Sequence, residues 1–247
     1  MERLDLRRLR RPVDVYLVRH GESEGNRNGK ILGRMDLGLS ELGEEHARAA
    51  GRFFAAELGT GSDTGGPSLY LATSPLQRCR QTAARIREEA GLPEPEVREE
   101  FLELDTGVFS GKGLGEIARE MPEAFATFRV ESWEAVEGAE GIASLYSRAV
   151  KAWELLVDRA NEGAHAVIAV THAGFLQWLL KASFAGPEQA WMPVIKAANC
   201  GIFHCHLEPT WYDPAGGDGP AGPATGPEKA DGFFAEWRKM NYIPYGG

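Results

Sequence analysis

Two histidines of the chain directly follow apolar segments. Arg19 and His20 come after residues 13–18, and His172 comes after residues 166–170. In α/β folds, the loops at the carboxyl ends of such strands carry the functional groups. Histidine can serve as a nucleophile, base or acid near neutral pH, and the arginine guanidinium binds anions through paired hydrogen bonds. The pattern therefore predicts an anion site that also holds a nucleophile or a base.

Three further polar residues occupy positions that can reach the same site. Asn26 follows His20 closely enough to fold back over one pocket. Arg78 lies in the first turn of a helix that we expect after Ser74-Pro75, since serine caps helices and proline fits their first turn. Glu103 precedes a glycine-containing loop beyond another predicted strand. These positions make all three candidates for the same pocket.

The elements that position these residues alternate between apolar strands and amphipathic helices. This alternation predicts an α/β fold, a three-layer α/β/α sandwich with a mostly parallel central sheet. We expect strands at 13–18, 69–72, near Val97, 165–171 and 202–207, and helices at 41–58, 74–90, 142–161 and 174–185.

The chain divides into three parts in this interpretation. Residues 1–12 form a basic arm that we expect to be frayed, and residues 13–208 form one α/β domain with a cap region at about 105–140. Residues 209–247 comprise a Gly/Pro-rich loop and an aromatic C-terminal segment. Because that segment is apolar, we expect it to pack on the domain or to form a homodimer.

Composition excludes several classes of partner. The 247 residues include 27 basic and 36 acidic ones, for a net charge of −9. This balance argues against nucleic acids and membrane surfaces as partners. The first residues lack the apolar core of a secretion signal, and the three cysteines suggest no disulfide framework. We therefore expect a cytoplasmic location.

Together, the polar segments resemble the histidine phosphatase superfamily, whose fold is described as phosphoglycerate mutase-like. The resemblance is to branch 1. A related branch of that superfamily uses an aspartate at the position of Ala173, which favours Glu103 as the proton donor here. The resemblance covers most of residues 13–205 and rests on segments that occur in the family's order: Arg19-His20-Gly21-Glu22-Ser23 with Asn26, Gly33-Arg34 with Asp36 and Leu39-Ser40, Ser74-Pro75-Leu76 with Arg78 and Gln81-Thr82-Ala83, Glu103 ahead of Gly107, and Thr171-His172-Ala173-Gly174.

The resemblance implies metal-independent hydrolysis of small-molecule phosphomonoesters through a phosphohistidine on His20, without a cofactor. Glu103 would protonate the leaving oxygen and then activate water. Asp105, two residues further on, is an alternative for this role. The resemblance implies two overlapping sets of residues: catalytic His20, Glu103, His172 and Arg19, and phosphate-binding Arg19, Asn26, Arg78 and His172.

Two other functions stay open at this point. A cofactor-dependent phosphoglycerate mutase needs basic groups for a second anion, but the segment from Lys112 to Glu140 carries more glutamates than basic residues, which favours a phosphatase. A catalytically idle binding protein is the other alternative. Phe125, Phe128 and Trp133 are candidates for an apolar rim of the pocket or for core packing.

A metal site is a further alternative near the last predicted strand. Cys200, His204 and His206 would share one strand face, as metal ligands can. Their position in the resemblance favours an ordinary packed or solvated strand face instead, so we expect no metal ligands.

Overall fold

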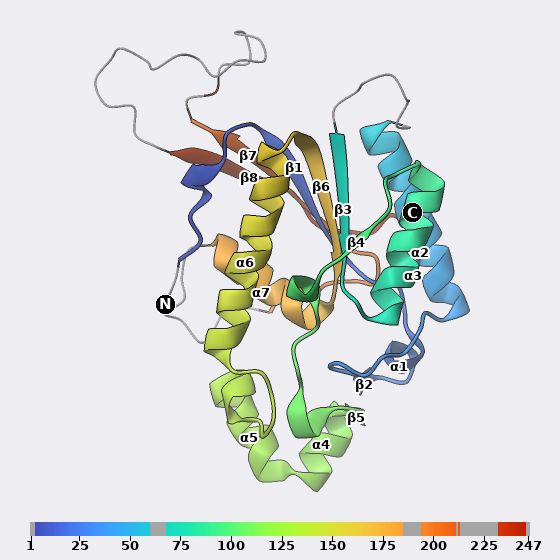
Figure 1. The fold of residues 1–247 in the computed structure, drawn as a ribbon. Coiled ribbons are helices and arrows are strands. Elements are labelled where there is room, and N and C mark those ends of the chain that lie inside the picture. The colour runs from blue at the N-terminus through green and yellow to red at the C-terminus, as the bar shows by residue number, and fades with distance from the viewer. Residues whose placement is uncertain (1–2, 60–67, 185–193, 211, 213–231, 246–247) are drawn as a thin grey trace.

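A six-stranded sheet forms the centre of the computed structural model, which describes residues 3–59, 68–184, 194–210, 212 and 232–245 (Figure 1). Its strands lie in the order β4-β3-β6-β1-β7-β8. Strands β4, β3, β6 and β1 are parallel, whereas β7 and β8 are antiparallel to their neighbours. Their bounds are β1 (Val13–Arg19), β3 (Ser68–Thr73), β4 (Glu96–Val97), β6 (Ala164–Thr171), β7 (Ile202–Pro209) and β8 (Phe233–Tyr242).

Helices cover both faces of this sheet, which confirms the predicted three-layer α/β/α sandwich (Figure 1). One face packs on α6 (Ile142–Asn161) and α7 (Ala173–Ser183), and the other on α2 (Glu41–Leu58) and α3 (Gln77–Ala90). Side chains alternate along β1, so that Val15 faces the first pair of helices and Tyr16 the second. No described helix has the length and apolar character needed to cross a membrane.

A smaller layer lies beyond the carboxyl ends of the parallel strands (Figure 1). It contains α1 (Glu24–Arg27), α4 (Leu114–Glu120), α5 (Pro122–Glu131) and a two-stranded sheet of β2 (Lys30–Ile31) and β5 (Lys112–Gly113). Phe109, Ile117 and Val136 form a separate apolar cluster there. The β2–β5 pairing ties the segment after His20 to the region expected as a cap.

The basic residues at the start of the chain are more ordered than a frayed arm. Leu6 and Leu9 are buried, at 4% and 2% exposure, in the cluster that α6 forms with the sheet. Their spacing places both on one side of the short 3₁₀ helix Leu6–Arg8. Arg8 also forms an ion pair with Asp158 on α6. Two leucines among the arginines thus anchor this segment.

The aromatic segment near the C-terminus forms the edge strand β8 (Phe233–Tyr242), antiparallel to β7. Trp237 packs near Trp153 of α6, with ring centroids 6.3 Å apart. Phe233 and Phe234 are instead exposed, at 39% and 54%. The Gly/Pro-rich stretch at 213–231 lies outside the described residues.

Candidate active site

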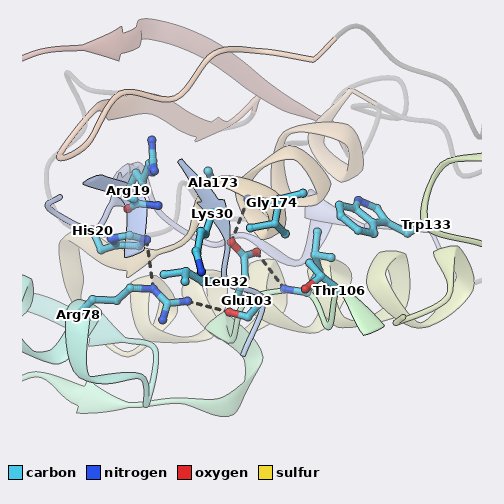
Figure 2. A pocket seen from close by; sticks show the side chains of 14 residues that line it. Arg19, His20, Lys30, Leu32, Arg78, Glu103, Thr106, Trp133, Ala173 and Gly174 are labelled. Carbon is cyan, nitrogen blue, oxygen red and sulfur yellow. Dashed lines mark hydrogen bonds between the residues drawn. The ribbon is translucent and has the colours of Figure 1, made fainter. Parts of the chain in front are cut away.

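A cavity of about 210 Å³ opens where β1, β3 and β6 end (Figure 2). It is smaller than the roughly 300–1,000 Å³ of typical drug-sized ligand pockets, so it suits a small molecule. We call Arg19, His20, Arg78 and Glu103 its floor, and Lys30, Ile31, Leu32 and Trp133 its rim. Asn26, another residue proposed from the sequence, also lines the cavity.

His20 is held as a neutral imidazole with a defined proton position. Its Nδ1 lies 2.7 Å from the Gly21 carbonyl oxygen. A carbonyl only accepts, so Nδ1 carries the proton and Nε2 is the unprotonated nitrogen with the lone pair. Arg78 Nε donates to this Nε2 at 3.3 Å. Burial and the charges of Arg19 and Arg78 hold the pKa of His20 well below its usual value.

Arg78 is almost completely buried, at 1% exposure, and each nitrogen of its guanidinium donates at least one hydrogen bond. Nε donates to both His20 and His172 Nδ1, the latter at 3.1 Å. Nη1 and Nη2 donate to the carbonyls of Met35 and Gly33 at 2.7 and 2.9 Å. These bonds fix the plane of the guanidinium beside the imidazole of His20.

His172 lies behind this guanidinium and is not among the cavity-lining residues. Its ring centroid is 5.1 Å from that of His20. Nε2 lies 2.8 Å from Ser74 Oγ, and Nδ1 accepts from Arg78. Burial and the nearby charge of Arg78 lower the pKa of His172 well below the usual value. In this structure, His172 therefore lies directly behind two residues of the floor, Arg78 and His20.

Arg19, on the floor, has a side-chain donor without a partner among the described residues. Its Nη1 donates to the Ala197 carbonyl at 2.7 Å. Its Nε is buried, and among the described residues it finds no hydrogen-bond partner. A buried donor of this kind is costly unless a ligand satisfies it. Arg19 Nε therefore marks a place for an anion.

Glu103 reaches the cavity from the loop after β4 and sits at the N-terminus of α7. Its Oε1 accepts from the amides of Leu104 and Phe175 at 2.9 and 2.8 Å. Among the described residues, its Oε2 accepts from Gly174 alone, at 3.2 Å, and is the oxygen with room for a proton. A Cβ on Gly174 would lie 2.7 Å from Oε1, so glycine permits this approach. Burial outweighs these hydrogen bonds and raises the pKa of Glu103.

Asp105 does not line the cavity, which leaves Glu103 as the carboxylate in position. The Asp105 carboxylate accepts instead from the Gly107 amide at 3.0 Å, in the turn that follows. It also lies 4.0 Å from Arg34. The structure thus separates two carboxylates that sequence reasoning left as alternatives.

His204 and His206 share one partner on the neighbouring strand. Both ring systems contact Asp14 Oδ1, at 2.7 and 3.0 Å. Among the described residues, no group of His, Cys, Asp and Glu side chains has the arrangement of a metal site. Cys200 is buried near the floor, where its amide donates to the His20 carbonyl at 3.2 Å.

The rim contains one residue named from the sequence and one that was missed. Trp133 lines the cavity, while Phe125 and Phe128 pack in the cap cluster. Lys30 also lines the cavity, and Figure 2 shows its side chain among those that converge there. The one sequence feature that could have indicated Lys30 as a lining residue is its position shortly after Asn26, between two motifs of the site.

The loop 197–201 supports the floor from behind. The Asn199 side chain donates to the His20 carbonyl at 3.3 Å and to Asn26 Oδ1 at 3.4 Å. Two residues near the C-terminus hold this loop: Asn241 Oδ1 accepts from the Ala198 amide at 2.7 Å, and Tyr245 donates to the Asn199 carbonyl at 2.6 Å. The floor therefore depends on contacts from the far end of the sheet.

The profile of the histidine phosphatase superfamily (branch 1) matches residues 15–211 of this chain. The chain belongs to this superfamily. Asn241 and Tyr245, which hold the loop behind the floor, lie outside the matched residues.

Individual proteins that are similar to this chain include two named phosphatases. Phosphoserine phosphatase 1 of Hydrogenobacter thermophilus is 34% identical over 138 residues, which cover 55% of this chain and 60% of that protein. Glucosyl-3-phosphoglycerate phosphatase of Mycolicibacterium vanbaalenii is 28% identical over 193 residues, which cover 76% of this chain and 80% of that protein. The solved structure of mycobacterial hydrolase 2 shares the fold, with a TM-score of 0.71 at 21% identity over 96% of this chain and 94% of that one.

Proposed function

We propose that the protein hydrolyses small-molecule phosphomonoesters through a phosphohistidine on His20, with no metal ion. The observation that carries this proposal is the state of His20. Its Nδ1 proton is committed to the Gly21 carbonyl, and its Nε2 lone pair lies beside Arg78 in a cavity that also holds Glu103. The named phosphatases among the relatives support the same reaction class.

In the first step, His20 Nε2 attacks phosphorus and forms an N–P bond while the ester P–O bond breaks. The leaving oxygen takes the proton of Glu103. Burial favours this role because it raises the pKa of the carboxyl and keeps a proton available at mildly acidic pH. The lowered pKa of His20 keeps the nucleophile neutral under the same conditions.

In the second step, the Glu103 carboxylate removes a proton from water. The water oxygen attacks phosphorus, the N–P bond breaks, and inorganic phosphate leaves. Glu103 regains its proton and His20 its lone pair, so the site is restored. One carboxyl group thus serves as acid and then as base.

We infer that the phosphoryl oxygens are bound by Arg19, Arg78, Asn26 and His172. Phosphoryl transfer depends mainly on positioning and charge stabilisation, for which guanidinium groups suit the oxygens of the transition state. The unpartnered Nε of Arg19 supports its part. Arg78 and His172 would exchange present hydrogen bonds for the ligand, with His172 acting behind Arg78.

A phosphate-release assay tests this proposal. The full-length protein and its His20→Ala variant are incubated with a panel of phosphomonoesters in the presence of EDTA. We expect release by the parent protein alone, and samples with ³²P-labelled ester that are quenched in alkaline detergent should retain alkali-stable label on the protein, which a later acid treatment removes. Equal release by both proteins, or release abolished by EDTA, would contradict the proposal.

Two alternatives have their own outcomes in the same experiment. Conversion of 3- to 2-phosphoglycerate faster than phosphate release would indicate a mutase. No turnover of any ester would indicate a binding protein. The cytoplasmic location and the homodimer remain predictions, which fractionation of cells and the mass in solution would test.

A further inference from the structure

The rim carries a positive charge that the proposed chemistry does not use. Lys30 lines the cavity and is exposed, and none of the described residues forms a hydrogen bond or ion pair with its ammonium. Arg19 and Arg78, by contrast, are held on the floor by backbone carbonyls. Lys30 is therefore the cation of the cavity that can bind a second group of the substrate.

The backbone of Lys30 is held firmly even though its side chain is free. Lys30 pairs with Gly113 in the short antiparallel sheet, and the Gly111 amide donates to the Ile31 carbonyl at 2.7 Å. The neighbouring lysine on the paired strand, Lys112, is instead bound by Glu120 at 3.0 Å and does not line the cavity. Lys112 is thus a suitable control for Lys30, because it is a lysine of the same small sheet that is already paired with a carboxylate.

The rest of the rim is apolar. Leu32 is buried and Trp133 is half-buried. The indole of Trp133 is supported from behind by Phe128, with ring centroids 4.8 Å apart. A ligand group bound beyond the phosphoryl position therefore meets an apolar wall and one ammonium group.

We propose that the rim selects phosphomonoesters whose leaving group carries a carboxylate, which Lys30 binds while Trp133 contacts the carbon skeleton. This inference rests on the proposed function. A carboxylate suits Lys30 because the ammonium is a compact, hydrated point charge that needs no fixed fork geometry. The protein has a net charge of −9, which repels a substrate with a second anionic group. An unpaired cation beside the phosphoryl position offsets this repulsion locally.

Two matched pairs of esters test the inference. Phenyl phosphate and 4-carboxyphenyl phosphate differ by one carboxylate on an aromatic body, and glycerol 3-phosphate and 3-phosphoglycerate differ by one on an aliphatic body. The quantity measured is the ratio of kcat/KM between the two members of a pair. It is compared in the parent protein, Lys30→Met, Lys30→Arg and the control Lys112→Met.

We expect Lys30→Met to lower this ratio about two- to fivefold, the range for one exposed ion pair. The loss should fall mainly on KM of the carboxylate ester, and Lys30→Arg should restore most of it. Raising the ionic strength should lower the ratio in the parent protein and much less in Lys30→Met. Lys112→Met should leave the ratio as it is.

Two results would overturn the inference while leaving the proposed function intact. An equal loss for both members of each pair would place Lys30 on the transferred phosphoryl group. An unchanged ratio would show that Lys30 binds nothing on the leaving group. Hydrolysis of other phosphomonoesters but of neither carboxylate ester would also count against the inference alone. If the parent protein hydrolysed no phosphomonoester through His20, the proposed function would fail and the inference with it.

Discussion

The floor and the rim of the cavity are held in opposite ways. On the floor, the polar atoms of His20, Arg78 and Glu103 are bound by backbone groups or by each other, and these residues come from the core domain. On the rim, Lys30 has no partner among the described residues and Trp133 packs on the separate cap cluster. Hydrogen bonds therefore fix the side chains of these floor residues in one arrangement, whereas the Lys30 side chain on the rim is left exposed to solvent.

The difference teaches where chemistry and selectivity can vary independently. A fixed floor pre-organises charge around a phosphoryl group, so a substitution there affects every substrate. A rim residue touches only the leaving group, so its loss affects some substrates more than others. Substitutions on either side should therefore differ in size and in substrate dependence.

The largest effect is expected at His20. His20→Ala removes the atom that forms the N–P bond, and turnover should fall on the order of 10⁴- to 10⁶-fold for all esters. Steady-state phosphate release measures this loss, and circular dichroism checks that the variant is folded. A loss of activity toward only some esters would contradict the expectation that substitutions on the floor affect every substrate.

Glu103→Gln should have the next largest effect, about 10²- to 10⁴-fold, because the general acid is lost. The loss should be small for 4-nitrophenyl phosphate, whose leaving group needs little protonation. In the parent protein, kcat/KM should fall as pH rises through the raised pKa of Glu103, since the acid must be protonated. Glu103→Gln should lack this alkaline decrease, and a pH profile of both proteins decides the matter. An unchanged profile would assign the proton transfer to another group.

A smaller effect is expected from the contacts behind the floor. Asn241 has φ of 56°, so Asn241→Gly removes the acceptor of the Ala198 amide without straining the backbone. Displacement of the loop that binds Arg19 should raise the inhibition constant of inorganic phosphate about three- to tenfold. Asn241→Asp, which keeps the acceptor, should restore the constant. Phosphate inhibition that is equal in all three proteins would show that the floor does not need this loop.

The smallest effect is expected at Trp133. Trp133→Leu should lower kcat/KM for an aryl ester about two- to tenfold, the range for loss of an aromatic contact, and less for an aliphatic ester. Phe125→Leu is the control, because Phe125 lies in the cap without lining the cavity. Equal losses in both variants would attribute the effect to cap stability rather than to contact with the substrate.

Much of the floor was predictable because its residues follow strands with clear apolar patterns. The position of His172 was not, since sequence order does not show that its Nδ1 would accept from Arg78 while its side chain stays outside the cavity lining. The rim was harder still. Lys30 belongs to a two-residue strand whose partner is far along the chain, and no local pattern marks such a pairing.

The edge strand β8 escaped prediction for a related reason. Its half-buried positions are Trp237, Lys239 and Asn241, so two of the three are polar and the sequence lacks the apolar alternation of a half-buried strand. The burial of Leu6 and Leu9 was likewise hidden by the arginines around them. In both segments, contacts with distant parts of the chain determine the structure, and the local sequence does not show them.

The contacts of Asn241 and Tyr245 with the loop 197–201 have a consequence for synthesis of the protein. A ribosome-bound chain that has not yet reached Asn241 already contains every residue that lines the cavity. In such a chain, the loop 197–201 keeps its hydrogen bonds with Arg19 and His20 but lacks those with Asn241 and Tyr245. The order in which the chain emerges thus places the support behind the floor after the residues of the floor itself.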